Sequence, residues 1–389
     1  MKRPRPKRRG ALGQETEQLL RLATGLAESG SRTEDRYWED RLSTLIDEVL
    51  SNHDEESFNV ALDHLYGAHI EAYEELADFI ESRAENAPAV SAGHEILLVA
   101  APILAWSRYN IPAGTIPAAV RANLRVHLQA HVFAENTRIA LADFLFSPDQ
   151  LPQGYCATSA FTAVLGRAAM DGKDLHIETK GLPETAHFLS DTRYLLAAVA
   201  VTRGQPIFAW QEADGTRERA LHQWRNQGGA CLAPLLPGCA TEVVLPEAYF
   251  AANRQADRAS RPYAVRASVA FLGAELEVPA SRLRAVVAPF HDRQLEEFRI
   301  GFGMLDRDDI AHGVVWPLLG AEDENTETLA EIEAVLRDSG VTEIVALDHA
   351  FPLEYCDDCG APLYPSADGE IVHAEMPEGH GEHPPRHLH

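Results

Sequence analysis

The spacing of the apolar residues changes near residue 150 and divides the chain into a helical and a mixed region. In the first predicted helix, an i, i+3, i+4, i+7 pattern comprises Leu19, Leu22, Ala23 and Leu26. Residues with this spacing share one face of an α-helix, and that face becomes its buried stripe. Similar patterns recur as far as Phe146. We therefore predict an all-α N-terminal domain of about five or six helices over residues 14–146.

Beyond this boundary the apolar residues form short runs that are bounded by proline and glycine. Runs such as 195–201 and 283–288 have the length and composition of β-strands. A helix is predicted at 326–338, because its apolar residues share a face and Gly340 stands at the usual position of a C-terminal cap. The chain is long enough for more than one core. We predict an α+β multidomain fold in which an α/β domain covers residues 154–355.

Two short strings recur within the α/β region and suggest an internal duplication. Pro-Leu-Leu and Thr-Glu-Val-Val within residues 234–244 resemble Pro-Leu-Leu and Thr-Glu-Ile-Val within residues 317–345. One helical insertion in the second string accounts for the different spacing. We predict two pseudo-symmetric α/β modules, with copies at about 190–252 and 281–355. The alternative is chance recurrence in a chain rich in Leu, Ala and Val.

The most specific chemical motif is the pair Cys356 and Cys359, which two residues separate. A Cys-x-x-Cys loop presents two thiolates from one turn to a single tetrahedral Zn²⁺, with Zn–S distances of about 2.3 Å. Downstream, His373 follows a predicted hairpin turn at 368–370 and a short return strand. We therefore predict a structural zinc site resembling a small zinc ribbon in the segment 356–389.

The fourth metal ligand is less clearly specified, since the segment from His373 to the last residue, His389, contains five histidines including these two. His380 and His383 are the candidates that we expect to complete the shell of Cys356, Cys359 and His373. One alternative is a reduced cysteine pair on an exposed turn beside a solvated histidine-rich tail. Another is weak scavenging of Ni²⁺, Cu²⁺ or Zn²⁺ by that tail, because imidazole suits all three ions.

The cysteine turn also belongs to a longer string, Tyr-Cys-Asp-Asp-Cys-Gly-Ala-Pro-Leu-Tyr-Pro at residues 355–365. Together with the helical first half and the α/β second half, this ending resembles a bacterial family known as domain of unknown function 2863. The resemblance extends over nearly the whole chain. It implies no reaction, substrate or catalytic residue, so functional arguments have to come from the residues themselves.

The net charge of −25 is distributed unevenly along the chain. Residues 1–13 contain six Lys or Arg and no acidic residue, so the rest is strongly acidic. We predict a disordered basic tail at 1–13. The acidic body would repel nucleic acid, so any contact with RNA or a ribosome would be made by residues 2–9. A basic protein is the expected macromolecular partner.

The sequence favours a cytoplasmic protein without membrane association. It contains no run of roughly 18 apolar residues and no apolar segment typical of a signal peptide near its start. Its five cysteines, an odd number in a long chain, fit a reducing compartment in which thiols stay free or bind metal.

Four residues are weaker candidates for catalysis. Asp348 and His349 follow a predicted strand, and Glu247 stands at the position that the duplication makes equivalent to Asp348. Ligands bind near strand ends in α/β folds, although an exposed strand end is the simpler interpretation. Cys156 would begin a helix, where the helix dipole can activate a thiol, but burial as a small apolar residue is the favoured alternative.

We find no phosphate-binding loop, nucleophile elbow or His-Glu-x-x-His motif. The leading hypothesis is thus a non-catalytic binding or scaffold protein with a structural zinc knuckle. The first alternative is an enzyme whose pocket lies between the two α/β modules and uses Glu247, Asp348 and His349. The second is an RNA- or ribosome-associated protein that uses the basic tail and the zinc knuckle.

Overall fold

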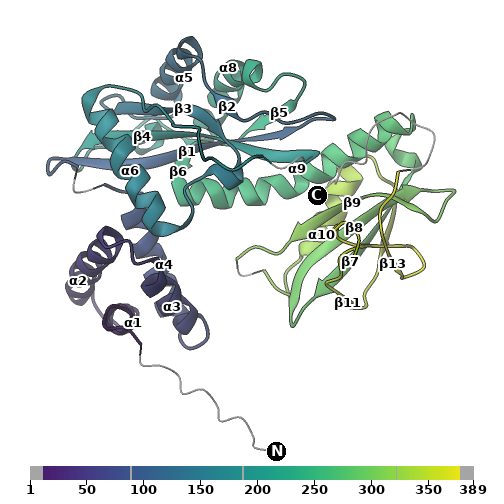
Figure 1. Cartoon of the computed structure of the whole chain (residues 1–389), viewed down its shortest axis with the longest axis horizontal. Helices are drawn as coiled ribbons and strands as arrows, with labels where there is room; N and C mark the ends of the chain where they lie inside the picture. The colour runs from purple at the N-terminus through teal and green to yellow at the C-terminus, as the bar shows by residue number, and fades with distance from the viewer. Residues whose placement is uncertain (1–11, 88–89, 186–187, 321, 377–389) are drawn as a thin grey trace, which may run out of the picture.

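The computed structural model describes residues 12–87, 90–185, 188–320 and 322–376. Figure 1 shows a helical bundle, a larger sheet with helices on both faces, and a smaller sheet that the C-terminal segment crosses. A single long helix, α9 (Tyr249–Glu275), passes from the larger sheet to the smaller one. The fold is therefore a mixture of helices and strands.

The bundle consists of α1 (Gln14–Ala27), α2 (Arg32–Ser51), α3 (Glu55–Tyr66) and α4 (Ile70–Ala84). Their buried residues form one core, which contains the predicted stripe of α1. Side chains that precede the helices satisfy free backbone N–H groups at their starts. Ser31 accepts a hydrogen bond from the N–H of Glu34, and Asp54 accepts one from the N–H of Ser57.

The all-helical region ends at Ala84, so the prediction that it continues to residue 146 is wrong. β1 (His94–Trp106) and β3 (Arg138–Phe146) are strands of the larger sheet, whereas α5 (Ala118–His131) between them is helical. Both strands are buried on both faces along most of their length. Such strands form continuous apolar runs, which residue spacing cannot distinguish from a buried helix.

The larger sheet has the strand order β2-β3-β4-β1-β5, and β6 also pairs with β1. The remaining strands are β2 (Gly114–Thr115), β4 (Ser190–Thr202), β5 (Ala240–Val243) and β6 (Glu247–Ala248). All these pairs are antiparallel, and β1 pairs with β4 along its whole length, from His94 opposite Thr202 to Trp106 opposite Ser190.

Two separate cores lie on the opposite faces of this sheet. On one face α5 packs with a π-helical turn (Trp224–Gly228) and α8 (Gly229–Leu232), which follow α7 (Arg217–Gln223). On the other face lie α6 (Gly154–Asp171) and the first half of α9. Alternate residues of β1 point into the two cores, as the two-residue period of a strand requires.

The smaller sheet has the order β10-β7-β8-β9, and β11 also pairs with β7. Its strands are β7 (Leu283–His291), β8 (Leu295–Met304), β9 (Ile310–Pro317), β10 (Glu343–Ala346) and β11 (Phe351–Pro352). One face packs against the second half of α9 and α10 (Thr328–Asp338). α10 lies where the sequence predicts a helix, and Gly340 beyond its end has a positive φ of 90°.

The two segments paired as repeat copies occupy unlike positions, so the structure does not contain the predicted duplication. Residues 241–243 belong to β5, which pairs antiparallel with β1. Residues 343–346 form β10, which pairs parallel with β7. Pro234 lies in a short 3₁₀ helix, whereas Pro317 ends a strand. Strings of three or four residues recur by chance in such a composition, and strand pairing depends on the rest of the chain.

The C-terminal segment lies against the face of the smaller sheet that α9 and α10 do not cover. It contains the hairpin of β12 (Tyr364–Pro365) and β13 (Ile371–Val372). Glycines of β8 and β9 permit its close approach: a Cβ at Gly301 would meet the Pro365 carbonyl, and a Cβ at Gly313 would overlap the ring of Tyr364. These glycines therefore form the surface on which the segment rests.

A glutamate at the end of the helical bundle connects the bundle to the long helix α9. Glu85, at the end of α4, accepts a hydrogen bond of 3.1 Å from the N–H of Phe250 in the first turn of α9. Burial raises the pKa of the Glu85 carboxyl to about 7; Glu81 adds to the rise, while the Phe250 N–H and Arg254 oppose it. The folded protein thus binds a proton at Glu85 at a pH where the unfolded chain does not.

We expect Gly313→Ala to destabilise the folded protein by about 1–3 kcal/mol, because the new methyl group would displace Tyr364 from the sheet. Urea unfolding monitored by circular dichroism measures this change. Gly114→Ala is the matched control, since Gly114 also lies in a strand and has no atom near the position of a Cβ. Equal stabilities of the two variants would contradict this account of the glycine face.

We expect Glu85→Gln to remove a pH-dependent loss of stability. Because the folded pKa lies above the unfolded value, ionisation of Glu85 lowers the free energy of unfolding as the pH rises from 5 to 8. The variant should match the wild type at pH 5 and exceed it at pH 8 by on the order of 2 kcal/mol. Urea unfolding across this pH range is the measurement, with the exposed Glu48→Gln as control. The prediction would be refuted if the difference in the free energy of unfolding between the wild type and the variant did not change with pH.

Candidate metal centre

The two cysteines lie on a tight loop whose neck is closed by backbone hydrogen bonds. The N–H of Leu363 donates to the carbonyl of Glu354 at 3.2 Å, and the N–H of Cys356 donates to that of Ala361 at 2.7 Å. At the tip, the N–H of Gly360 donates back to the Cys356 carbonyl at 2.8 Å. Gly360 has a φ of 73°, which only glycine adopts at little cost. The loop is therefore built to turn sharply around the sulfur atoms.

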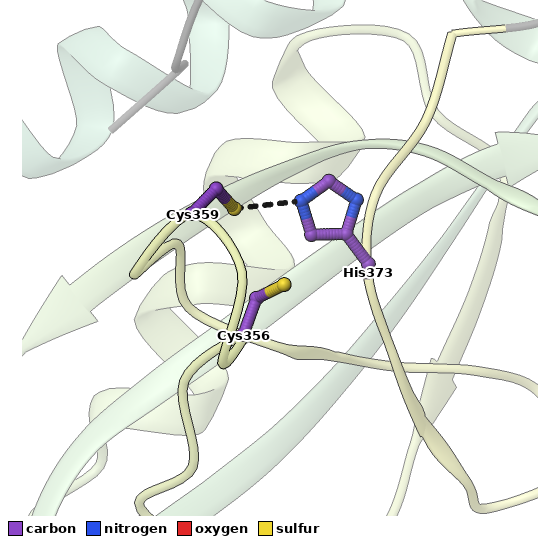
Figure 2. Close-up of side chains that lie close together, drawn as sticks. All are labelled: Cys356, Cys359 and His373. Atoms are coloured by element: carbon purple, nitrogen blue, oxygen red, sulfur yellow. Dashed lines mark hydrogen bonds between the residues drawn. The ribbon is translucent and has the colours of Figure 1, made fainter.

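His373 reaches this loop from the neighbouring hairpin, as Figure 2 shows. The hairpin turns at Gly369, which has a φ of 81°, and His373 follows directly after β13. The Sγ of Cys359 lies 3.3 Å from Nε2 of His373, and one donor atom from each of Cys356, Cys359 and His373 lies within 4.8 Å of the other two. In a tetrahedral zinc site such atoms are about 3.5–3.8 Å apart. The arrangement therefore fits one metal ion.

The local electrostatics favour a metal-binding state of these side chains. Backbone N–H groups of Cys359 and Asp358 lower the pKa of the Cys356 thiol, together with the Cys359 side chain. A carboxylate oxygen of Glu375 lies 3.5 Å from Nδ1 of His373, on the side of the ring away from Cys359. This leaves Nε2 of His373 as the nitrogen that faces the sulfur atoms. Thiolates and a neutral imidazole are the donor set that Zn²⁺ prefers.

Among the described residues, these three form the one cluster of His, Cys, Asp or Glu side chains that could hold a metal ion. Cys359 and His373 are exposed and Cys356 is half-buried, so the cluster lies at the protein surface. The predicted fourth ligands, His380 and His383, lie outside the described residues. A structural zinc site needs four protein ligands, and the described residues bring together three side chains that could hold a metal ion.

Comparison with known proteins places this arrangement in a family. The family model described as "Protein of unknown function (DUF2863)" matches residues 4–387. The chain belongs to this family. A search of the curated proteins and a search of the solved structures each found no significant match. Because the DUF2863 description names no activity, no residue role can be transferred, and the geometry has to carry the functional argument.

Three of the four weaker catalytic candidates, Glu247, Asp348 and His349, do not form a common site in this DUF2863 chain. Glu247 belongs to β6 of the larger sheet and pairs with Arg217. Asp348 and His349 are exposed and follow β10 of the smaller sheet, where the His349 ring packs 4.1 Å from that of Phe351. Two surface clefts of about 490 Å³ and 400 Å³ are lined by other residues. Neither of these two clefts contains any of the three side chains.

Cys156 does begin a helix, but that helix end is already occupied by a carboxylate. The N–H groups of Tyr155 and Cys156 at the start of α6 donate to the two oxygens of Glu55, at 2.9 and 2.8 Å. Burial, together with the hydrogen bond and the negative charge of the Glu55 carboxylate, raises the pKa of the Cys156 thiol to about 12. The thiol is therefore not activated as a nucleophile.

A charged cluster that sequence analysis did not find lies at the edge of the larger sheet. Asp143 of β3 accepts hydrogen bonds of 2.8 Å from Nδ1 of His176 and from the N–H of Ile177. Burial works to raise the pKa of Asp143, but these hydrogen bonds outweigh it and the pKa lies below its usual range. The imidazole of His176 is 79% exposed and lines neither cleft. The pair therefore holds the segment around Leu175 against β3. Its two members are too far apart in the sequence to be recognised as a motif.

The described residues include no helix with both the length and the apolarity needed to cross a lipid bilayer.

Proposed function

We propose that this protein is a non-catalytic binding or scaffold protein whose C-terminal segment is held by a structural zinc ion. Cys356, Cys359 and His373 supply three ligands, and His380 or His383 supplies the fourth. The observation that carries the proposal is the convergence of these three donor atoms within 4.8 Å of one another. Two thiolates and two imidazoles form a closed tetrahedral shell of the kind found in structural zinc sites.

The packing of the C-terminal segment supports a structural role for the metal. Apart from Tyr364, the apolar contacts of the segment with the sheet form a small cluster in which Phe351 packs against Ala288 and Phe290. Three partly buried side chains complete this cluster: Leu347, Leu353 and Ile371. So small a core contributes little to the stability of a loop-rich segment. A metal ion that joins the cysteine loop to the hairpin would supply the missing stabilisation. A catalytic zinc would in addition need an open position and a positioned acid or base.

The charge around the metal loop supports a basic partner. Residues 338–376 contain nine Asp or Glu and no Lys or Arg. Asp357 and Asp358, at the tip of the loop, are both exposed. A surface of this sign attracts cationic groups and repels the phosphates of nucleic acid. The RNA-binding alternative would depend on residues 2–9, which lie outside the described residues.

The cysteines support a cytoplasmic location as part of this proposal. All five are free thiols, including the two that lie on the metal loop. Thiols in this state, and thiolates bound to zinc, are typical of proteins in a reducing compartment.

We expect the protein purified without chelator to contain about one zinc ion per chain, measured by plasma mass spectrometry. Cys356→Ser/Cys359→Ser should abolish binding because both thiolates are lost. Truncation after Met376, and His380→Ala/His383→Ala, should weaken binding by removing the fourth ligand. Cys231→Ser/Cys239→Ser is the matched control, since it also removes two free cysteines and should retain the metal. A wild-type protein without bound metal would refute the proposal.

We expect a lysine-rich peptide to bind the zinc-loaded protein more tightly than a single-stranded RNA of equal length, because the surface around the loop is acidic. Fluorescence anisotropy at increasing ionic strength measures both affinities, and the affinity for the peptide should fall with added salt. Asp357→Asn/Asp358→Asn should weaken peptide binding. Tighter binding of the RNA, lost on deletion of residues 2–9, would favour the RNA-binding alternative instead.

A further inference from the structure

A fully buried arginine of the smaller sheet holds the neck of the metal loop. Arg299 lies in β8, far from the metal ligands in sequence, and its side chain is inaccessible to solvent. Its Nη1 donates hydrogen bonds to two backbone carbonyls, that of Glu354 at 2.6 Å and that of Leu363 at 2.8 Å. One guanidinium nitrogen thus binds the chain segments on both sides of the loop.

These two carbonyls belong to the residue pair that closes the loop. The N–H of Leu363 donates to the same Glu354 carbonyl that accepts from Arg299. Glu354 stands two residues before Cys356, and Leu363 immediately precedes β12, whose partner strand leads to His373. The position of Arg299 therefore determines where the thiolate loop and the histidine strand start, relative to each other and to the sheet.

The guanidinium is itself held firmly in place. Its Nε donates to a carboxylate oxygen of Glu297 at 2.6 Å. The ring of Phe290 lies 4.3 Å from the guanidinium carbon, and that of Tyr355 lies 5.0 Å from it. Arginine presents its donors in a rigid planar fork, whereas lysine presents a single charge on a flexible chain. A lysine in this position could not reproduce the bonds to both carbonyls and to Glu297.

We infer that Arg299 is the positioning residue of the metal centre and sets its affinity for zinc without being a ligand; the inference rests on the proposed zinc site. A loop that is fixed before the metal arrives loses less conformational freedom on binding. Residues that orient metal ligands from outside the coordination shell typically change metal affinity by about 10–100-fold. Arg299 acts in this way through the backbone of the loop.

The experiment is a measurement of zinc affinity by competition with a chromophoric chelator, for the wild type and for Arg299→Ala. We expect the variant to bind zinc about 10–100-fold more weakly. The visible absorption of bound Co²⁺ reports the ligand geometry, and we expect its tetrahedral bands to weaken or shift. Arg299→Lys keeps the charge and replaces the alanine variant if that variant does not fold. Its zinc affinity should lie between those of the wild type and Arg299→Ala.

Arg193 provides a closely matched control in the larger sheet. It is also fully buried and donates to two backbone carbonyls of a distant loop, those of Pro112 at 2.9 Å and Ile111 at 2.6 Å. It also pairs with a carboxylate two residues earlier in its strand, Asp191. Arg193→Ala should therefore lower stability in a similar way. Its zinc affinity and Co²⁺ spectrum should remain those of the wild type.

The outcomes separate the two proposals. If the wild type binds zinc and Arg299→Ala or Arg299→Lys binds it equally well, with an unchanged Co²⁺ spectrum, the positioning role is wrong and the zinc site stands. If Arg193→Ala loses as much affinity as Arg299→Ala, the loss reflects general destabilisation and the positioning role is again wrong. If the wild type binds no zinc, both proposals fail together.

Discussion

The structure depends on the division of one helix between two hydrophobic cores. The first half of α9 contributes Tyr249, Ala252 and Ala256 to the core of the larger sheet. Its second half contributes Val265, Val269 and Leu272, among others, to the core of the smaller sheet. A helix of 27 residues is about 40 Å long, enough to serve both. Each sheet would lose one of its covering helices without α9.

The middle of α9 is also attached to both sheets. Around Pro262, which cannot donate a backbone hydrogen bond, the flanking side chains bind in two directions. The hydroxyl of Tyr263 donates to the carbonyl of Ala240 in β5 at 2.8 Å, while Arg261 donates to the carbonyl of Pro317 at the end of β9 at 3.0 Å. The helix thus connects the two sheets through its backbone, through a separate set of core residues for each sheet, and through specific hydrogen bonds to each.

Four charged side chains in this protein satisfy backbone groups at sites far away in the sequence. Glu55 and Glu85 fill the N-terminal ends of α6 and α9, where free N–H groups would otherwise be buried. Arg193 and Arg299 do the reverse and donate to buried carbonyls of distant loops. This use of charge explains why Cys156 is not activated. It also explains how the cysteine loop, which has few apolar contacts of its own, can keep a defined position on its sheet.

Residue type and spacing were sufficient to predict the elements that depend on neighbouring residues. Helical spacing identified the buried stripe of α1, and Gly340 marked the end of α10. Likewise, the short spacing of Cys356 and Cys359 and the predicted hairpin turn indicated His373 as a candidate ligand, and the structure places it beside both cysteines. Local geometry follows from a few adjacent backbone angles, which residue type and spacing already restrict.

The remaining features depend on tertiary contacts, because they join segments that are far apart in the chain. β1 and β3 are strands because they are buried between two layers of helices, although their apolar runs also fit a helix. The two similar strings occupy unlike positions for the same reason: the direction of a strand depends on its pairing partner, and a short string does not determine it. Arg299 carries no signal in the sequence, as its role consists of contacts with carbonyls more than 50 residues away. Backbone carbonyls are present at every residue, so no residue pattern indicates which of them a buried arginine will bind.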